Sequence, residues 1–334
     1  MNFFISFLIF LIILFLYIHI IHQLKTSEDL EIYEMDYSTN SQLQEVCEVK
    51  QPVLFEFESV YPDIFENFSK EEIFSKYGSY DVKIKDNRDY IQTTSVDYVV
   101  LSMQSSQNLV ESDPGSHYFS ENNEELVDES GLVSEYKELD TYLKPSFTLQ
   151  TKYDIMYGSI NTATPLRYHL NYRQFFIVKS GKIHVKMTPM KSKKYLKPIK
   201  DYDNYEFRSP INVWNPQPEY LHEMDKLKFL EFDVHAGHVL YIPAYWWYSI
   251  KYSNEKDTII YNATYNSVMN CVAHLPQWVL YFLQQHNIYK KIAKTKVLQQ
   301  EIKEQEEREE EDNENENGEQ SSTPKKIGEI VEKI

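Results

Sequence analysis

The sequence has very few cysteines, only two in 334 residues. This excludes the disulfide framework of a small secreted domain, and Cys47 and Cys271 lack the paired spacing of a zinc site. One long-range bridge would use both residues, but two free thiols are the interpretation that we favour. Hydrophobic residues make up 42% of the chain and aromatic residues 15%, which is enough for a folded core.

Basic residues are also scarce, with 34 Lys and Arg against 51 Asp and Glu. The net charge of −17 argues against a general polyanion binder, so we expect no nucleic-acid partner. Much of the excess is local, because residues 301–320 hold eleven acids against Lys303 and Arg308. Glycine is rare too, and the bias toward Tyr, Ile, Asn, Lys and Glu is typical of an AT-rich genome, such as that of a protist or a large DNA virus.

One long apolar run stands at the start of the chain. Phe3–Ile21 is nineteen residues without a formal charge, about the length that crosses a hydrocarbon core as a helix. A cleaved signal peptide is the alternative, but it usually has a basic beginning and small residues at the cleavage site, and neither is present. We therefore predict a single-pass membrane protein with an uncleaved N-terminal anchor. The side of the membrane is left open, since Lys25 is the only nearby basic residue.

The rest of the chain divides by composition and periodicity. Short β-patterned runs such as "DYVVLSM" and "KFLEFDV" alternate with turn signals, as an all-β sandwich or barrel requires. A helical period follows residue 276, and the acidic end of the chain cannot bury enough apolar surface to fold. The predicted division is a transmembrane anchor (1–22), a polar tether (23–44), a β domain (45–275) with a surface insertion (105–131), a C-terminal helix (276–305) and an acidic disordered tail (306–334).

Two segments carry a family resemblance. The first is "MYGSINTATPLRYHLNYRQFFIVKSGKIHVKMTP" (156–189), and the second is "AGHVLYIPAYWWYSIKYS" (236–253). Together they resemble the JmjC-like branch of the cupins, the Fe(II)/2-oxoglutarate hydroxylases related to asparaginyl hydroxylases. The resemblance implies a mainly β fold, a double-stranded β-helix or jelly roll, for the β domain.

The family's metal ligands are not matched. A non-haem Fe(II) oxygenase needs two His and one carboxylate on one face of the metal. In the family these come from His-x-Asp on one strand and from a His after Trp-Trp, and the matching positions hold Arg167, His169 and Tyr248. Arg167 is the most damaging change, because a guanidinium stays protonated and offers no lone pair. Tyr248 is interpreted as a packing substitute in an emptied site.

The cosubstrate positions of the family match better. Thr164 and Lys182 correspond to its 2-oxoglutarate ligands, Asn262 to a pocket Asn, and Gln174 to a polar residue before Phe-Phe. The resemblance therefore implies a pocket that still holds a carboxylate, and Arg167 beside Lys182 would strengthen it. Each residue also has a structural interpretation, such as a solvated Lys at a Gly-Lys turn or a Thr packed before Pro165.

A rearranged metal site is the fallback. It would use His169, His184 and Tyr248, since imidazole and phenolate are both competent ligands, although a carboxylate is missing.

The leading hypothesis is a membrane-anchored, non-catalytic binding or scaffolding module that has no cofactor and retains a 2-oxoglutarate-like pocket. One alternative is an active hydroxylase with an atypical site that uses Fe(II) and 2-oxoglutarate. Another is a structural homodimer through residues 277–305, which presents the acidic tail to a protein partner.

Overall fold

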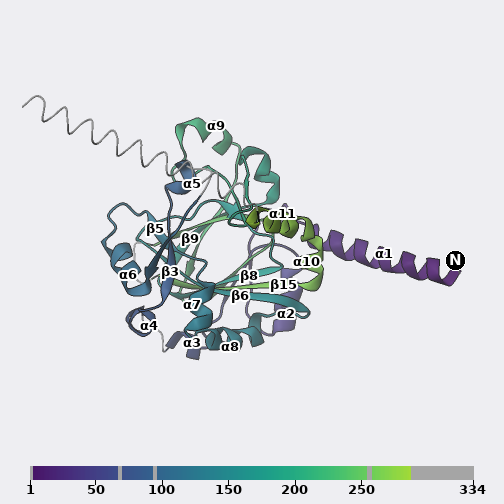
Figure 1. Cartoon of the computed structure of the whole chain (residues 1–334), viewed down its shortest axis with the longest axis horizontal. Helices are drawn as coiled ribbons and strands as arrows, with labels where there is room; N and C mark the ends of the chain where they lie inside the picture. The colour runs from purple at the N-terminus through teal and green to yellow at the C-terminus, as the bar shows by residue number, and fades with distance from the viewer. Residues whose placement is uncertain (1–2, 67–69, 93–95, 254–257, 287–334) are drawn as a thin grey trace, which may run out of the picture. The chain divides into compact units, whose positions relative to one another are not determined.

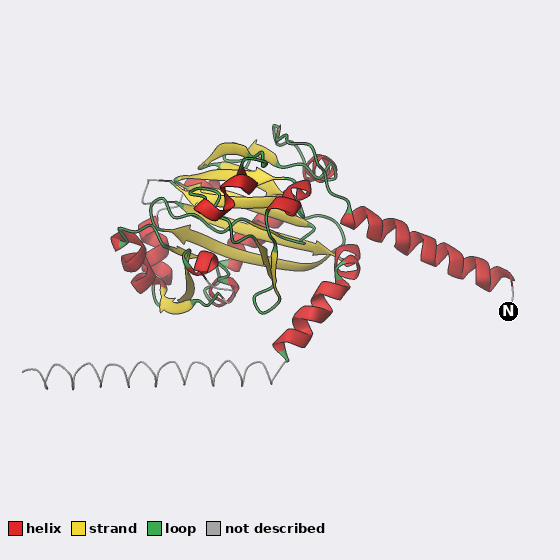
Figure 2. Cartoon of the chain, turned by 90° about the horizontal axis from the view of Figure 1, so that it is seen from above, coloured by secondary structure: helices red, strands yellow, loops and turns green. Residues whose placement is uncertain are grey.

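The computed structural model describes residues 3–66, 70–92, 96–253 and 258–286. Residues 1–281 form one compact unit, and residues 282–334 a second, of which the described part is the end of helix α11. The first unit is built on two sheets, stacked as layers with short helices outside them (Figures 1 and 2). The predicted mainly β jelly roll is confirmed. The predicted acidic tail and most of the predicted C-terminal helix lie outside the described residues.

The larger sheet has nine strands in the order β1-β2-β13-β8-β15-β6-β5-β3-β4, and the smaller has six in the order β10-β11-β7-β14-β9-β12. All the strand pairs are antiparallel except β1 with β2. The strands are β1 Tyr33–Glu34, β2 Val53–Glu56, β3 Asp81–Asp86, β4 Val99–Ser102, β5 Tyr118–Ser120, β6 Thr148–Gly158, β7 Arg167–Tyr168, β8 Arg173–Ser180, β9 Lys182–Thr188, β10 Ile199–Asp201, β11 Glu206–Arg208, β12 Leu230–His235, β13 His238–Ile242, β14 Trp247–Tyr252 and β15 Ile259–Ser267.

One long helix, α1, precedes the strands, and the other helices are short. The helices are α1 Phe3–Leu24, α2 Asn40–Cys47, α3 Asp63–Glu66, α4 Lys70–Tyr77, α5 Asp89–Gln92, α6 Met103–Ser112, α7 Glu124–Glu129, α8 Val133–Leu143, α9 Leu221–Met224, α10 Val268–Ala273 and α11 Leu275–Gln285, with 3₁₀ turns η1 Met190–Tyr195 and η2 Pro218–Tyr220. Helix α1 is about 33 Å long at 1.5 Å per residue. It is long and apolar enough to cross a membrane.

Strand β8 shows how the sequence sets the layers. It lies between β13 and β15, and neighbouring residues point to opposite faces of the sheet. Phe175 and Ile177 pack with the helices on the outer face, whereas Phe176 and Val178 pack toward the smaller sheet. Both faces are covered, so the strand reads as a continuous apolar run rather than an alternating one. Each buried Phe contributes roughly 1.5–3 kcal/mol to folding.

The turn from β8 to β9 depends on Gly181. Its φ of +69° lies in the left-handed region, where a side chain is strained. A Cβ at this position would also clash with the side chain of Thr258. The turn predicted from the Gly-Lys pair is therefore present, and only glycine fits it.

Two of the predicted boundaries need correction. Residues 105–131 were predicted to be a surface insertion, but they include β5, which pairs with β6 and β3 in the larger sheet. Leu126 and Val127 of the same segment are buried in the core. The predicted tether over 23–44 contains β1 and the start of α2, so the β domain begins earlier than residue 45. Cys47 and Cys271 are both free thiols.

Candidate functional site

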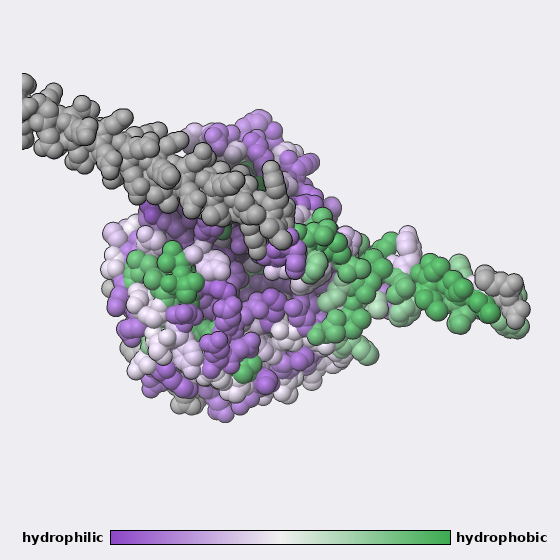
Figure 3. Space-filling model, in the orientation of Figure 1, coloured by the Kyte–Doolittle hydropathy of each residue, from purple (hydrophilic) through white to green (hydrophobic). Residues whose placement is uncertain are grey.

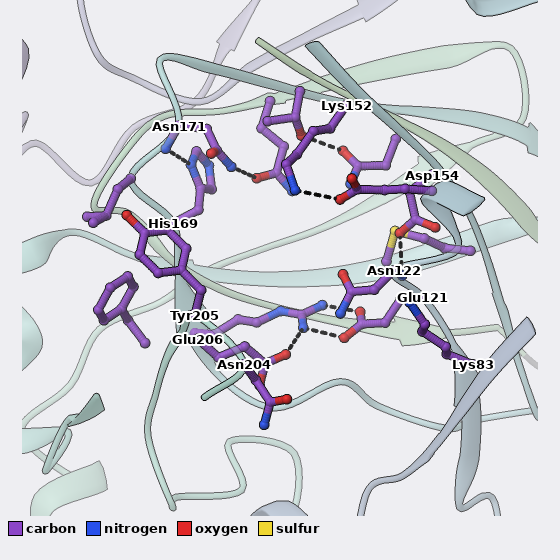
Figure 4. Close-up of a pocket in the computed structure, with 18 of the residues that line it drawn as sticks. Lys83, Glu121, Asn122, Lys152, Asp154, His169, Asn171, Asn204, Tyr205 and Glu206 are labelled. Carbon is purple, nitrogen blue, oxygen red and sulfur yellow. Dashed lines mark hydrogen bonds and ion pairs between the residues drawn. The ribbon is translucent and has the colours of Figure 1, made fainter. Parts of the chain in front are cut away.

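A cavity of about 540 Å³ is lined by residues of both sheets (Figure 4). Strand β15 contributes Asn262, Thr264 and Asn266, which are two residues apart and so share one face. The opposite side comes from β7 and β11 of the smaller sheet. Trp278 and Tyr281 of α11 complete the lining. This is the cavity in which the resemblance places a metal and its cosubstrate.

Arg167 enters this cavity from β7 and is buried. Its guanidinium makes two hydrogen bonds to the Glu121 carboxylate, one of 2.6 Å from Nη1 and one from Nη2. Nη1 also lies 3.5 Å from Oε1 of Glu206. Burial alone would lower the pKa of Arg167, but the charges of the two carboxylates outweigh it and raise the pKa well above its usual value. Arg167 is therefore a cation whose charge is already balanced.

Lys85 joins the same group. Its Nζ lies 3.0 Å from Oε1 of Glu121 and 3.0 Å from Oε1 of Glu206. Lys85, Glu121, Arg167 and Glu206 form a buried ion cluster, two of whose members are labelled in Figure 4. Burial raises the pKa of Glu121, but Arg167 and Lys85 reverse this and bring it to about 2. The cluster joins the two sheets, because Lys85 and Glu121 belong to the β3–β5 region and the other two to β7 and β11.

His169 is buried, with both ring nitrogens engaged by the backbone. Nε2 lies 3.1 Å from the carbonyl oxygen of Ile242, and Nδ1 accepts the Asn171 N–H at 3.1 Å. A carbonyl only accepts, so Nε2 carries the ring proton. Burial lowers the pKa of His169 to about 3, although the two backbone hydrogen bonds act to raise it. The ring is thus neutral, and neither nitrogen has a lone pair to offer a metal.

Tyr248 packs inside the cavity. Its ring centroid lies 5.6 Å from Cζ of Arg167 and 5.8 Å from the ring of Phe176. Gln174 Nε2 is 3.5 Å from the hydroxyl. Burial raises the pKa of Tyr248, so the phenol keeps its proton rather than becoming a phenolate ligand.

The fallback metal site from His169, His184 and Tyr248 is not assembled. His184 lies on the outer side of β9, where its Nδ1 contacts Asp233, and it does not line the cavity. Within the described ranges, no group of three or more His, Cys, Asp or Glu is arranged to hold a metal ion. The side chains present do not fit an Fe(II) centre.

The four predicted cosubstrate residues are divided. Gln174 and Asn262 line the cavity, but Thr164 and Lys182 do not. Lys182 Nζ pairs with Asp233 at 3.3 Å on the surface, because Lys182 shares the outer face of β9 while Ile183 faces the core. Thr164 accepts the N–H of Ile250 at 3.1 Å and packs between strands. The predicted anion pocket therefore lacks its lysine.

Sequence reasoning missed most of the cavity's charged residues. Lys85, Glu121 and Glu206 are not in either segment that carries the resemblance, and Glu121 fell in the predicted insertion. Asp154 was also missed. It accepts backbone N–H groups of Asn122 and Asn123 at 2.8 Å each, yet burial raises its pKa to about 7.

Acids outnumber bases around the cavity. The lining holds seven carboxyl groups, Glu121, Glu124, Glu125, Asp128, Asp154, Asp203 and Glu206, and four bases, Lys83, Lys85, Lys152 and Arg167. An aromatic wall stands beside them, in which Tyr205 lies 5.0 Å from the ring of Trp278 and 5.3 Å from that of Tyr281. The cavity thus offers acceptors and ring faces rather than free cations.

The sequence of residues 34–271 matches the family model of the cupin-like domain, and the chain belongs to this family. The JmjC-like cupin resemblance is thereby confirmed. No curated protein matches the chain.

Proposed function

We propose that this protein is a membrane-anchored cupin-like binding module that works without a catalytic metal. One observation carries the proposal: where the family places its first metal-binding His, Arg167 points into the cavity and is paired with Glu121. A guanidinium has no lone pair for a metal. Moving it aside would take the two hydrogen bonds of Arg167 from buried Glu121 and leave Lys85 as the cation between Glu121 and Glu206, at a cost of roughly 3–5 kcal/mol.

The neighbouring positions support the same conclusion. His169 has both nitrogens occupied, and Tyr248 is a protonated phenol. Binding iron here would require three separate rearrangements, each breaking a satisfied contact. The proposed function therefore includes no oxidative step at this site.

The lining also indicates the class of ligand. Arg167, which would have strengthened an anion pocket, is balanced by carboxylates, and Lys182 lies outside. Carboxylates and amides accept hydrogen bonds, and aromatic faces attract cations. We propose a ligand that donates hydrogen bonds, an amine rather than a dicarboxylate such as 2-oxoglutarate.

The anchor is the third part of the proposal. Helix α1 is uncharged over nineteen residues and long enough for a bilayer core. The residues around the end of α1, HIIHQLKTSED, lack the pair of small residues at which a signal peptide is usually cleaved. We propose that α1 is retained and spans the membrane once.

The metal part is tested on the full chain purified in detergent. After incubation with Fe(II) and removal of free metal, we expect much less than one iron or zinc per chain by mass spectrometry, and no decarboxylation of 2-oxoglutarate. Stoichiometric iron that is lost in the His169→Ala variant would overturn the proposal in favour of an atypical hydroxylase.

The ligand part is tested by calorimetric titration with two probes, spermidine and 2-oxoglutarate, at equal ionic strength. We expect saturable binding of spermidine only, weakened severalfold in Trp278→Ala, which removes part of the aromatic wall. Trp214→Ala is the control, because Trp214 does not line the cavity. Saturable binding of 2-oxoglutarate, or equal loss in both variants, contradicts an amine site here.

A further inference from the structure

Helices α10 and α11 expose a row of aliphatic side chains. Val268, Val272, Leu275, Val279 and Leu280 are between 39% and 57% exposed. Contiguous apolar surface of this kind is rare on soluble monomers and marks a contact with a protein or a membrane. Figure 3 shows this surface as a green area over α10 and α11. We call these five residues the aliphatic surface.

The aliphatic surface lies next to the end of α1. Helix α10 is in contact with α1, and Gln23 in the last turn of α1 is buried against the domain. His22 Nε2 lies 3.4 Å from Oε2 of Glu48, so the end of α1 is also tied to residues beside α2. In Figure 3 the apolar colour continues from α10 to the base of α1.

If α1 spans a bilayer, its last turn determines the depth at which the aliphatic surface lies. The last turn of a spanning helix lies at the boundary between hydrocarbon and headgroups. A surface that touches this turn lies at the same depth, within the few ångströms where amphipathic helices bury their apolar faces.

The other side of α11 faces the cavity. Trp278 and Tyr281 line it and pack on Tyr205, whereas Val279 and Leu280 point outward. Helix α11 therefore separates the cavity from the aliphatic surface. Trp and Tyr are also the residues that prevail at membrane interfaces, where a ring can have one apolar and one wet side.

We propose that the aliphatic surface rests in the bilayer interface beside α1, so that lipid is the partner of α10 and α11. The domain is then held against the membrane with one wall of its cavity at headgroup level. This inference rests on the anchor in the proposed function and adds a second membrane contact to it. A second copy of the chain is the competing occupant.

The test uses nitroxide spin labels on the full chain in phosphatidylcholine vesicles. Cys271→Ser removes the partly exposed thiol, and single cysteines are then introduced by Val279→Cys, Ile9→Cys and Val99→Cys. Val99 is an exposed valine of β4 and serves as the matched control, while Ile9 reports on α1 itself. Accessibility to oxygen, which partitions into lipid, is compared with accessibility to a water-soluble nickel chelate.

We expect the ratio of oxygen to nickel accessibility to be severalfold higher at position 279 than at position 99, and high at position 9. A high ratio at 9 with a water-like ratio at 279 overturns the surface contact and leaves the anchor standing. A water-like ratio at both positions overturns the anchor as well. Low accessibility to both reagents at 279, with spin–spin broadening between labels, identifies a second copy instead of lipid and also rejects the inference.

Discussion

The guanidinium of Arg167 and the carboxylate of Glu121 face each other inside the barrel through two hydrogen bonds. Such a bidentate pair is the strongest geometry available to these groups. Two further charges, Lys85 and Glu206, complete the balance. Arg208 Nη1 lies a further 3.9 Å from Oε2 of Glu206, so the site that holds iron in related folds is occupied by ion pairs in this chain.

Arg167→Met should strongly destabilise the protein. It removes both hydrogen bonds that Arg167 gives to buried Glu121, which then keeps only the contact with Lys85, so we expect a loss of about 3–5 kcal/mol in the free energy of unfolding. Denaturant unfolding followed by near-UV circular dichroism measures it. The control is Arg88→Met, because Arg88 is paired with Asp86 but exposed, and should have little effect. Equal losses in the two variants would show that burial of the ion cluster is unimportant.

The low pKa of buried His169 predicts that the free energy of unfolding depends on pH in the acidic range. Its pKa is about 3 in the folded chain against an ordinary value of 6.5 in the unfolded chain, so between these values only the unfolded chain is protonated. Stability therefore rises with pH across this window. In His169→Gln the slope should fall by about one proton, roughly 1.4 kcal/mol per pH unit, in unfolding curves between pH 5 and 6. Exposed His235 provides the control, and an unchanged slope in His169→Gln contradicts a buried neutral ring.

Lys179 predicts a dependence of stability on pH in the alkaline range. It is buried in β8, with Nζ 4.9 Å from the ring of Tyr261, and burial lowers its pKa to about 7. Between pH 7 and 10.5 the unfolded chain binds the proton and the folded chain does not, so stability rises with pH in this window. Lys179→Met should stabilise the protein at pH 7 and abolish this rise. Exposed Lys200→Met should do neither in the same unfolding series.

The Gly181 turn allows a matched pair of substitutions. Gly181 and Gly131 both have positive φ, +69° and +78°, but a Cβ at 131 meets nothing within 4 Å. Gly131→Ala should lose about 1–2 kcal/mol from backbone strain alone. Gly181→Ala should lose clearly more, because Thr258 has to move as well. Thermal unfolding of both variants measures the difference, and equal values would argue against a tight turn.

The fold was predictable because the informative residues lie close together in sequence. The strand with Phe175 and Phe176, the Gly181 turn and the Trp246-Trp247 pair are local patterns, and each has the predicted structure. The inward position of Arg167 followed from its match to a ligand position. These parts need no knowledge of distant contacts.

The partners of Arg167 were not predictable in this way. Glu121 follows a three-residue strand with no apolar alternation, and the pairing of β5 with β3 and β6 brings it to the cavity. Lys182 failed for a different reason. Strand residues alternate between faces, and the apolar residues of β9 are Ile183, Val185 and Met187, so the alternation already places Lys182 on the outer face. The expectation followed the family match instead of this local pattern.

The ion cluster has a consequence for how the chain folds. Its four members are spread from residue 85 to residue 206 and come from both sheets. Of these four residues, each sheet supplies one acid and one base. Glu121 accepts a hydrogen bond from Arg167, and Glu206 accepts one from Lys85, so each carboxylate has a donor from the opposite sheet. A chain with only the larger sheet formed would leave buried Glu121 without the two hydrogen bonds of Arg167, and one with only the smaller sheet formed would leave Glu206 without the bond from Lys85. We therefore expect the two layers to assemble in a single cooperative step, without a stable half-barrel intermediate.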